Sequence, residues 1–308
     1  MSDHLIDDSH LPETREWFAK CQEVIAGGES SYARLTGTRP IVMSHGDGAH
    51  FYDVDGNRYI DWCLGYGPMI FGHRPRFIVD AIAEQITQRG MLYTFPHELD
   101  WEVGRKIVQA VPGIDQVRFA NSGSEATQAA MRLARGYTGK EKILKWEGSY
   151  NGFLDCHAFS HMPDLETAGL EKYPRTLPSG AGIPKAVEDT VVVGCFNDLE
   201  SVEELMRRHG HELAAVLAEP ILADCGIIPP EPGFLEGLRR LCDEYGVLLI
   251  FDEIITGFRV ALGGAQERYG VIPDITCVAK AVGGGTPGAA AFGAKKHIMD
   301  IETENVVL

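Results

Sequence analysis

Two apolar stretches decide the fold: Val-Leu-Leu-Ile-Phe-Asp-Glu at residues 247–253 and Asp-Ile-Thr-Cys-Val-Ala-Lys-Ala-Val-Gly-Gly-Gly at residues 274–285. Neither alternates between apolar and polar residues, which is typical of strands that are covered on both faces. The first carries a carboxylate, Asp252, near its end, and the second places one amine, Lys280, at the start of a glycine-rich turn. The two stretches predict buried strands whose ends carry chemically useful groups.

The chain around them repeats this pattern. Further apolar runs without alternation occupy residues 117–120, 143–146, 191–193 and 214–218. Helical stripes with i, i+3, i+4, i+7 spacing separate them, as in Ala126, Ala129, Ala130, Leu133 and Ala134. Buried strands interleaved with helices predict an α/β domain over residues 73–308, with a mostly parallel sheet and helices on both of its faces.

Residues 1–72 have a different pattern and predict a small N-terminal segment. Residues 13–28 are expected to be helical, and three short strand-like runs follow at residues 41–44, 49–53 and 58–62. Turns containing Asp-Gly separate these runs, which favours hairpins and therefore an antiparallel meander. Much later in the chain, prolines and glycines interrupt residues 161–190, which predicts a long loop.

The overall charge limits the choice of partner. The chain has 308 residues, with 28 Lys and Arg against 44 Asp and Glu, a net charge of −16. Such an acidic balance argues against nucleic acid and anionic membranes, and it means that an anion must be held by local backbone dipoles. Seven scattered cysteines and an N-terminus without a signal peptide predict a cytoplasmic protein. The histidines lack the spacing of metal ligands, so no metal site is expected.

Candidate site residues come at or just after the carboxyl ends of the predicted strands. In open α/β sheets ligands bind beyond these ends, so the residues are expected to share one ligand-binding edge. They are Ser122, Gly123, Ser124, Tyr150, Glu219, Asp252 and Lys280. An amine that forms an imine, an acid that holds a pyridinium nitrogen and amides that cradle a phosphate are what pyridoxal phosphate needs. The constellation therefore predicts a pyridoxal-phosphate enzyme.

Each residue also has a simpler interpretation. Ser122 and the residues after it could form only a helix N-cap, and Asp252 could cap the next turn. Tyr150 could be a half-buried core tyrosine, and most lysines are solvated surface charges. The shared edge is the argument against all four interpretations.

Several motifs make the chain similar to the class-III pyridoxal-phosphate aminotransferases of fold type I, and most of all to the glutamate-1-semialdehyde aminomutase branch. The motifs are residues 53–61, 121–127, 148–152 and 252–259, and Lys280 with its glycines. The resemblance implies a seven-stranded type of sheet, a homodimer, and small-molecule amino donors and acceptors as substrates.

The resemblance also implies roles for individual residues. Gly123 and Ser124 would hold the phosphate, Tyr150 would stack on the ring, Asp252 would bind the ring nitrogen, Ile255 would pack beneath the ring, Glu219 would lie near the coenzyme and Lys280 would form the imine. Arg34 would meet the substrate carboxylate, and Tyr66 would lie over the active site.

The chain departs from the branch in two ways. Asn151 stands where the branch usually has histidine, and residues 91–98 and 160–175, which shape the pocket and its lid, also differ. Family members extend beyond the equivalent of Leu308, through a segment that reaches the partner's phosphate and then a C-terminal domain. The sequence is therefore expected to be truncated relative to the family.

Three functions remain open. The first is an aminotransferase that works through a Lys280 imine, and the second is a glutamate-1-semialdehyde 2,1-aminomutase that keeps its intermediate bound. The third is an inactive truncated homologue. A nicotinamide dehydrogenase is disfavoured, because the glycines at residues 283–285 lack the G-x-G-x-x-G spacing.

Overall fold

The computed structural model describes residues 11–31, 41–91 and 94–304. The chain divides into two compact units, residues 1–91 and residues 92–308. The domain boundary predicted near Gly72 falls before helix α2 (Arg76–Glu84), which groups with the first unit.

The first unit contains the predicted antiparallel meander, in the order β1-β2-β3. The carboxylate of Asp53, at the end of β2, accepts hydrogen bonds from the backbone N of Asn57 (2.7 Å), from Asn57 Nδ2 (2.9 Å) and from the Tyr59 hydroxyl (2.8 Å). These bonds close the Asp-Gly turn that the sequence predicts. The elements of this unit are helix α1 (Pro12–Val24), the 3₁₀ helix η1 (Ala26–Gly28), β1 (Met43–Asp47), β2 (His50–Asp53), β3 (Arg58–Ile60), α2 and the π-helix η3 (Gln85–Arg89).

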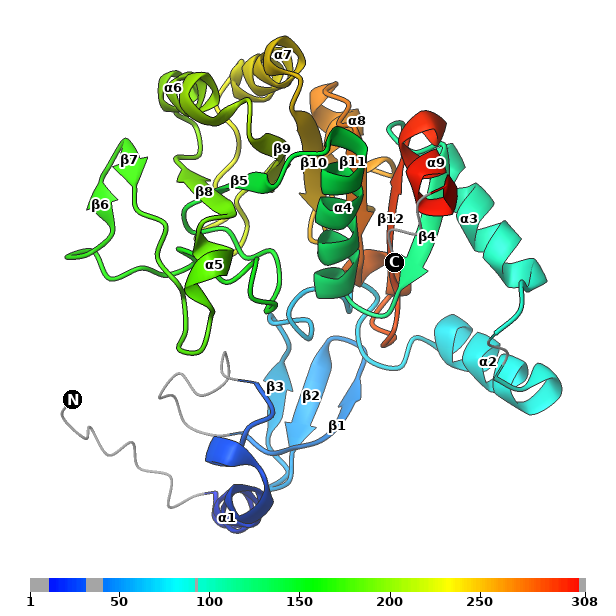
Figure 1. Ribbon diagram of the computed structural model, residues 1–308. Coiled ribbons are helices and arrows are strands. Elements are labelled where there is room, and N and C mark those ends of the chain that lie inside the picture. Colours follow the sequence, from blue (N-terminus) through cyan, green and yellow to red (C-terminus); the bar gives the residue numbers. More distant parts are fainter. Residues whose placement is uncertain (1–10, 32–40, 92–93, 305–308) are drawn as a thin grey trace. The chain divides into compact units, whose positions relative to one another are not determined.

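The second unit is built on a seven-stranded sheet in the order β4-β12-β11-β10-β9-β5-β8 (Figure 1). The pairs that β12 makes are antiparallel and the others are parallel, so β12 runs against the other strands. This confirms the predicted mostly parallel sheet. The strands are β4 (Gln116–Ala120), β5 (Lys142–Trp146), β8 (Val191–Gly194), β9 (Leu213–Ala218), β10 (Leu248–Glu253), β11 (Ile275–Val278) and β12 (Ala290–Ala294).

Helices cover both faces of this sheet, as predicted (Figure 1). Ile250 of β10 packs in one core cluster with residues of α4 (Gly123–Thr138) and α9 (Lys296–Glu304). Its neighbours Leu249 and Phe251 pack in a second cluster, with residues of α6 (Leu199–His209) and α7 (Phe234–Tyr245). Burial on both faces explains why β10 is apolar without alternation. The other helices of this unit are α3 (Glu98–Ala110), α5 (Lys185–Glu188), α8 (Gly264–Tyr269) and the 3₁₀ helix η4 (Lys280–Gly283).

Two features of the second unit differ from the sequence prediction. Strand β12 was not predicted, because its Ala-Ala-Phe-Gly-Ala composition lacks the β-branched residues that mark a strand. A side chain at Gly293 would come within 2.6 Å of the Gln116 backbone oxygen, so close strand pairing favours a small residue there. The predicted loop at residues 161–190 is mostly irregular, but it contains the short hairpin β6 (Gly169–Leu170) and β7 (Tyr173–Pro174) and helix α5.

Across the described ranges, none of the helices has the length and apolar character needed to cross a membrane.

Candidate active site

Asp252 lies at the end of strand β10, and Lys280 follows the adjacent parallel strand β11. Strands β10 and β11 pair in a register that sets Asp252 opposite Cys277. Lys280 comes shortly after Cys277, at the start of η4. Both residues therefore lie at the carboxyl edge of the sheet, and each one's charge influences the pKa of the other.

Lys280 combines a strained backbone with a partly buried amine. Its φ angle of 45° lies in the left-handed region, which non-glycine residues rarely adopt and which costs about 1–3 kcal/mol. Burial lowers the pKa of Lys280, while the carboxylates of Asp224 and Asp252 oppose this shift. The lowered pKa favours the neutral amine that a nucleophile requires.

Asp252 is a buried carboxylate, only 3% exposed. Its Oδ2 accepts a hydrogen bond from Asn151 Nδ2 (2.8 Å), and its Oδ1 accepts one from the backbone N of Ile254 (3.2 Å). Burial raises the pKa of Asp252, whereas these two hydrogen bonds and the charge of Lys280 lower it. A buried acid with so few partners is suited to bind a cationic N–H group.

Glu219 and Tyr150 lie at the same edge and are joined to each other. Glu219 directly follows β9, and its Oε1 accepts a hydrogen bond from the backbone N of Tyr150 (2.9 Å). Burial and the neighbouring Asp252 raise the pKa of Glu219. The Tyr150 side chain is 45% exposed and its ring lies 5.2 Å from that of His161. Glu219 thus fixes the backbone of a residue whose ring still has an open surface.

The predicted anion cradle forms the start of α4. Ser122 is the N-cap, and its Oγ accepts a hydrogen bond from Glu125 N (3.2 Å), so the capping interpretation holds for this residue. The first intrahelical bond runs from Ala126 N to Ser122 O, and the N–H groups of Gly123 and Ser124 therefore precede it. Such N–H groups at a helix N-terminus are suited to bind a phosphate.

Gly152 lies directly beside this cradle. Its φ angle is 132°, and a Cβ atom built on it would come within 2.7 Å of both Ser124 Oγ and His157 Nδ1. Glycine therefore leaves space next to the Ser124 hydroxyl that any side chain would fill.

A buried lysine holds the loop that carries Tyr150 and Asn151. Lys145 is 1% exposed, and its Nζ donates to the backbone oxygens of Ser149 (3.1 Å), His157 (2.8 Å) and Phe159 (2.9 Å). Lys145 was not predicted as a site residue, and its only signal in the sequence is a lone charge inside the apolar run at residues 143–146.

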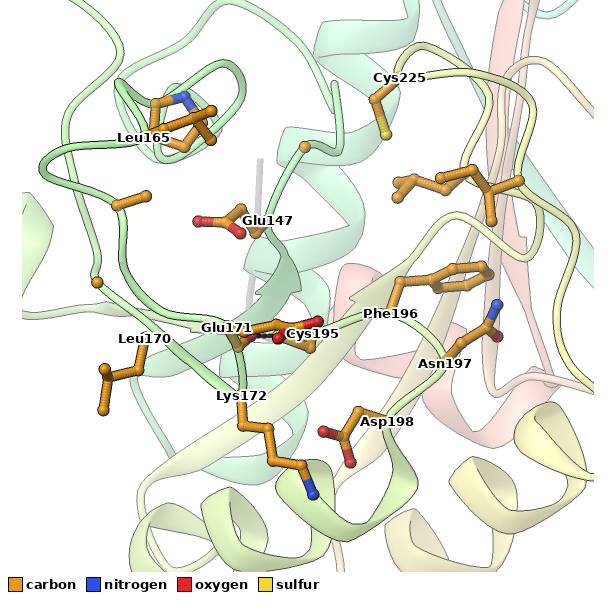
Figure 2. A pocket seen from close by; sticks show the side chains of 16 residues that line it. Glu147, Leu165, Leu170, Glu171, Lys172, Cys195, Phe196, Asn197, Asp198 and Cys225 are labelled. Carbon is orange, nitrogen blue, oxygen red and sulfur yellow. Dashed lines mark hydrogen bonds between the residues drawn. The ribbon is translucent and has the colours of Figure 1, made fainter.

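A cavity of about 700 Å³ lies beside the same loop, on the side of the predicted lid segment. Figure 2 shows the Glu147 carboxylate among the side chains that line it. Leu165 and Leu170 of the segment at residues 160–175 contribute to its wall, together with Phe196. Lys280 and Asp252 are not among the lining residues, so this cavity is distinct from the site around them.

Three predicted site residues remain, Ile255, Tyr66 and Arg34. Ile255 is partly buried in the turn that follows β10. Tyr66 belongs to the first unit, where it is 51% exposed and has a φ angle of 63°. Arg34 lies outside the described residues. In the part of the chain that the structure describes, no group of three or more His, Cys, Asp or Glu side chains could hold a metal ion.

Known proteins resemble the chain over most of its length. It is 45% identical to a glutamate-1-semialdehyde 2,1-aminomutase of Syntrophobacter fumaroxidans, over 89% of this chain and 62% of that protein. The aminomutase of Pelotomaculum thermopropionicum is also 45% identical, over 90% of this chain and 63% of that one. The chain therefore spans less than two thirds of the length of these relatives.

Solved structures show the same fold. An omega-transaminase from Sphaerobacter thermophilus is 36% identical and superposes with a TM-score of 0.88, over 93% of this chain and 64% of that one. A transaminase with PLP bound is 31% identical, with a TM-score of 0.85 over 93% and 65% of the two chains. The sequence pattern of the class-III aminotransferases matches residues 31–305. This match covers most of the sequence, and the chain belongs to the class-III aminotransferase family.

Proposed function

We propose that the protein binds pyridoxal phosphate through Lys280 and acts as an aminotransferase. The observation that carries the proposal is the shared sheet edge, where a buried carboxylate ends one strand and a lysine with a lowered pKa follows the adjacent parallel strand. Family membership and the neighbour that has PLP bound support the same coenzyme.

The residues present fit this coenzyme. Asp252 offers a buried carboxylate for the ring nitrogen, and the start of α4 offers N–H groups and the Ser122 and Ser124 hydroxyls for the phosphate. The absent side chain of Gly152 keeps the Ser124 hydroxyl open to an anion. Because the net charge is −16, these local donors must outweigh an unfavourable overall field.

When bound, the coenzyme supplies an aldehyde and an electron-withdrawing ring. Asp252 would keep a proton on the ring nitrogen, and Tyr150 would cover the ring, with its backbone fixed by Glu219. Ile255 would pack beneath the ring. Lys280 would hold the coenzyme through its aldehyde group, and its neutral amine would serve as the base that takes the proton from the donor's Cα.

The proposed substrates are an amino donor and a keto acid or aldehyde acceptor. Arg34 would meet a substrate carboxylate, and Tyr66 would contribute an aromatic side chain. A second candidate function, glutamate-1-semialdehyde 2,1-aminomutase, is favoured by the 45% identity to proteins of that name. Incubation with glutamate-1-semialdehyde and no second amino acid separates the two, because only the mutase then forms 5-aminolevulinate.

Covalent capture tests the coenzyme assignment. After incubation with pyridoxal phosphate and borohydride, mass spectrometry should find one phosphopyridoxyl group, on the peptide that contains Lys280. Lys280→Ala should abolish this adduct, whereas Lys185→Ala should keep it, because Lys185 is an exposed lysine on α5. An adduct that survives Lys280→Ala would contradict the proposal. An adduct without turnover for any donor would identify the chain as an inactive homologue.

The proposed setting is a homodimer in the cytoplasm, acting on small molecules and not on nucleic acid. The cysteines of the described residues are all free, which suits a reducing compartment. The acidic net charge disfavours binding to nucleic acid.

A further inference from the structure

Asn151 lies in a chain of buried polar side chains that ends at Asp252. Its Nδ2 donates to Asp252 Oδ2 (2.8 Å), and its Oδ1 accepts from the Ser149 hydroxyl (2.9 Å). Asn151 and Asp252 are each 3% exposed, and Ser149 is fully buried. Water therefore has little access, and the direction of each hydrogen bond in this chain matters.

The Ser149 hydroxyl faces two acceptors but has one hydrogen. Its Oγ lies 2.7 Å from the Trp146 backbone oxygen and 2.9 Å from Asn151 Oδ1, and both of these oxygens can only accept. The hydroxyl can satisfy one of them at a time. The Trp146 oxygen has a second donor, the Ser149 backbone N at 3.2 Å, so it stays bonded when the hydroxyl turns away.

Two arrangements of the chain keep its neighbouring side chains hydrogen-bonded to one another. With Asp252 ionised, Asn151 Nδ2 donates to the carboxylate and the Ser149 hydroxyl donates to Asn151 Oδ1. With Asp252 protonated, the acid donates to Asn151 Oδ1, Nδ2 donates to Ser149 Oγ, and the hydroxyl donates to the Trp146 oxygen. The two orientations of a carboxamide have the same shape, so the amide can turn over without repacking its surroundings.

We propose that Asn151 is a positioning residue for Asp252, and that its carboxamide, backed by Ser149, holds the carboxylate ionised and turns over when Asp252 takes up a proton. The role given to this arrangement rests on the proposed function, since Asp252 must be ionised to hold the protonated ring nitrogen of the coenzyme. The hydrogen-bond chain itself consists only of side chains of this protein.

The groups around Asp252 have opposing effects on its pKa. Burial raises its pKa, and the buried carboxyl of Glu219 and the thiol of Cys277 interact with it as further acids. Lys280 and Lys145 oppose this with positive charge. The hydrogen bond from Asn151 ranks first among the influences that lower the pKa of Asp252. Removing that donor should therefore shift the balance measurably.

The test is an NMR titration of the coenzyme-free protein carrying ¹³C-carboxyl aspartate and side-chain ¹⁵N asparagine labels, with Asp252→Asn used to assign the Asp252 signal. Asn151→Leu keeps the volume, excludes water and removes the donor. It should raise the Asp252 midpoint by about one to two pH units, the effect of one hydrogen bond to a charged group. Asn151→His, which restores an N–H donor, should return the midpoint toward that of the wild type.

A matched control exists in the first unit, where Asn57 Nδ2 donates to Asp53 Oδ2 at 2.9 Å. Asn57→Leu should move the Asp53 midpoint and leave that of Asp252 in place.

In the wild type, the Asn151 amide signal should titrate with the same midpoint as Asp252. This measurement tests the inference even if Asn151→Leu does not fold. The inference would be overturned by an Asp252 midpoint that is unchanged in Asn151→Leu. It would also be overturned by an Asn151 amide signal whose chemical shift does not change with pH. Neither result depends on coenzyme capture by Lys280, so failure of the proposed function is detected separately.

Discussion

At the residue scale, His157 is a buried histidine that is held neutral. It is 1% exposed, its Nε2 lies 3.2 Å from Thr127 Oγ1, and its Nδ1 has no hydrogen-bond partner among the described residues. The Thr127 hydroxyl donates to the Asn151 backbone oxygen (2.7 Å), so it accepts from His157, whose proton is therefore on Nε2. Burial, helped by the positive charge of Lys145, lowers the pKa of His157 to about 3.

This pKa predicts that His157 makes the fold sensitive to mild acid. An unfolded histidine titrates near 6.5, so between about pH 3 and pH 6.5 the unfolded state binds more protons and stability falls as the pH falls. From pH 7.5 to pH 5.0 the free energy of unfolding should drop by about 2 kcal/mol more in the wild type than in His157→Gln. Urea denaturation at both pH values measures the difference. Equal losses in the two proteins would show that His157 is not held neutral.

At the scale of single elements, strand β5 and the loop after it form one structural unit through Lys145. Burial lowers the pKa of Lys145 to about 8, so the ammonium form dominates at neutral pH. Only the ammonium has three hydrogens for the three backbone oxygens that it contacts. This contact closes the loop around Tyr150 and Asn151.

Lys145→Met should therefore lower the free energy of unfolding by about 3 kcal/mol, because three buried carbonyl groups each lose a charged donor. It should also make the loop at residues 148–160 a site of early proteolytic cleavage. Lys142→Met on the same strand is the control. Lys142 forms a partly exposed ion pair with Glu212 (2.7 Å), and its loss should cost less than about 1 kcal/mol. Equal losses for the two variants would contradict the role given to Lys145.

The elements that the sequence predicts are those whose pattern depends on burial alone. Strands β10 and β11 are long apolar runs, and α4 has a regular stripe, so both types of element are recognisable without tertiary information. Strand β12 is not recognisable, since its alanines and glycine acquire strand geometry only from pairing with β4 and β11. The contacts of Lys145 were unpredictable for a related reason, because its acceptors are backbone oxygens of an irregular loop.

At the scale of the whole molecule, sheet topology explains why the candidate site could be predicted in outline. Parallel strands end at one edge, so Glu219, Asp252 and Lys280 share that edge whatever the details of packing. Which side chains contact each other there depends on rotamers and loops, and the Ser149–Asn151–Asp252 chain was therefore not foreseeable. The proposed roles of Arg34 and Tyr66 depend on segments outside this sheet, and they stay predictions.

Helix α2 and the π-helix η3 that continues it expose an apolar stripe that bears on assembly. Val79 and Ile82 of α2 and Ile86 of η3 are 47%, 41% and 53% exposed, and they recur at the spacing of one helix face. None of the residues of α2 is buried in the described chain. An exposed stripe of this kind is typical of a surface that packs against a partner, and a second copy of the chain is the expected partner.

Light scattering should give twice the 33.8 kDa of one chain for the wild type. Ile82→Asp should shift the mass toward one chain, because it buries a charge in the contact, whereas Ala81→Asp, off the stripe, should not. A dimer that Ile82→Asp leaves intact would place the contact on another surface.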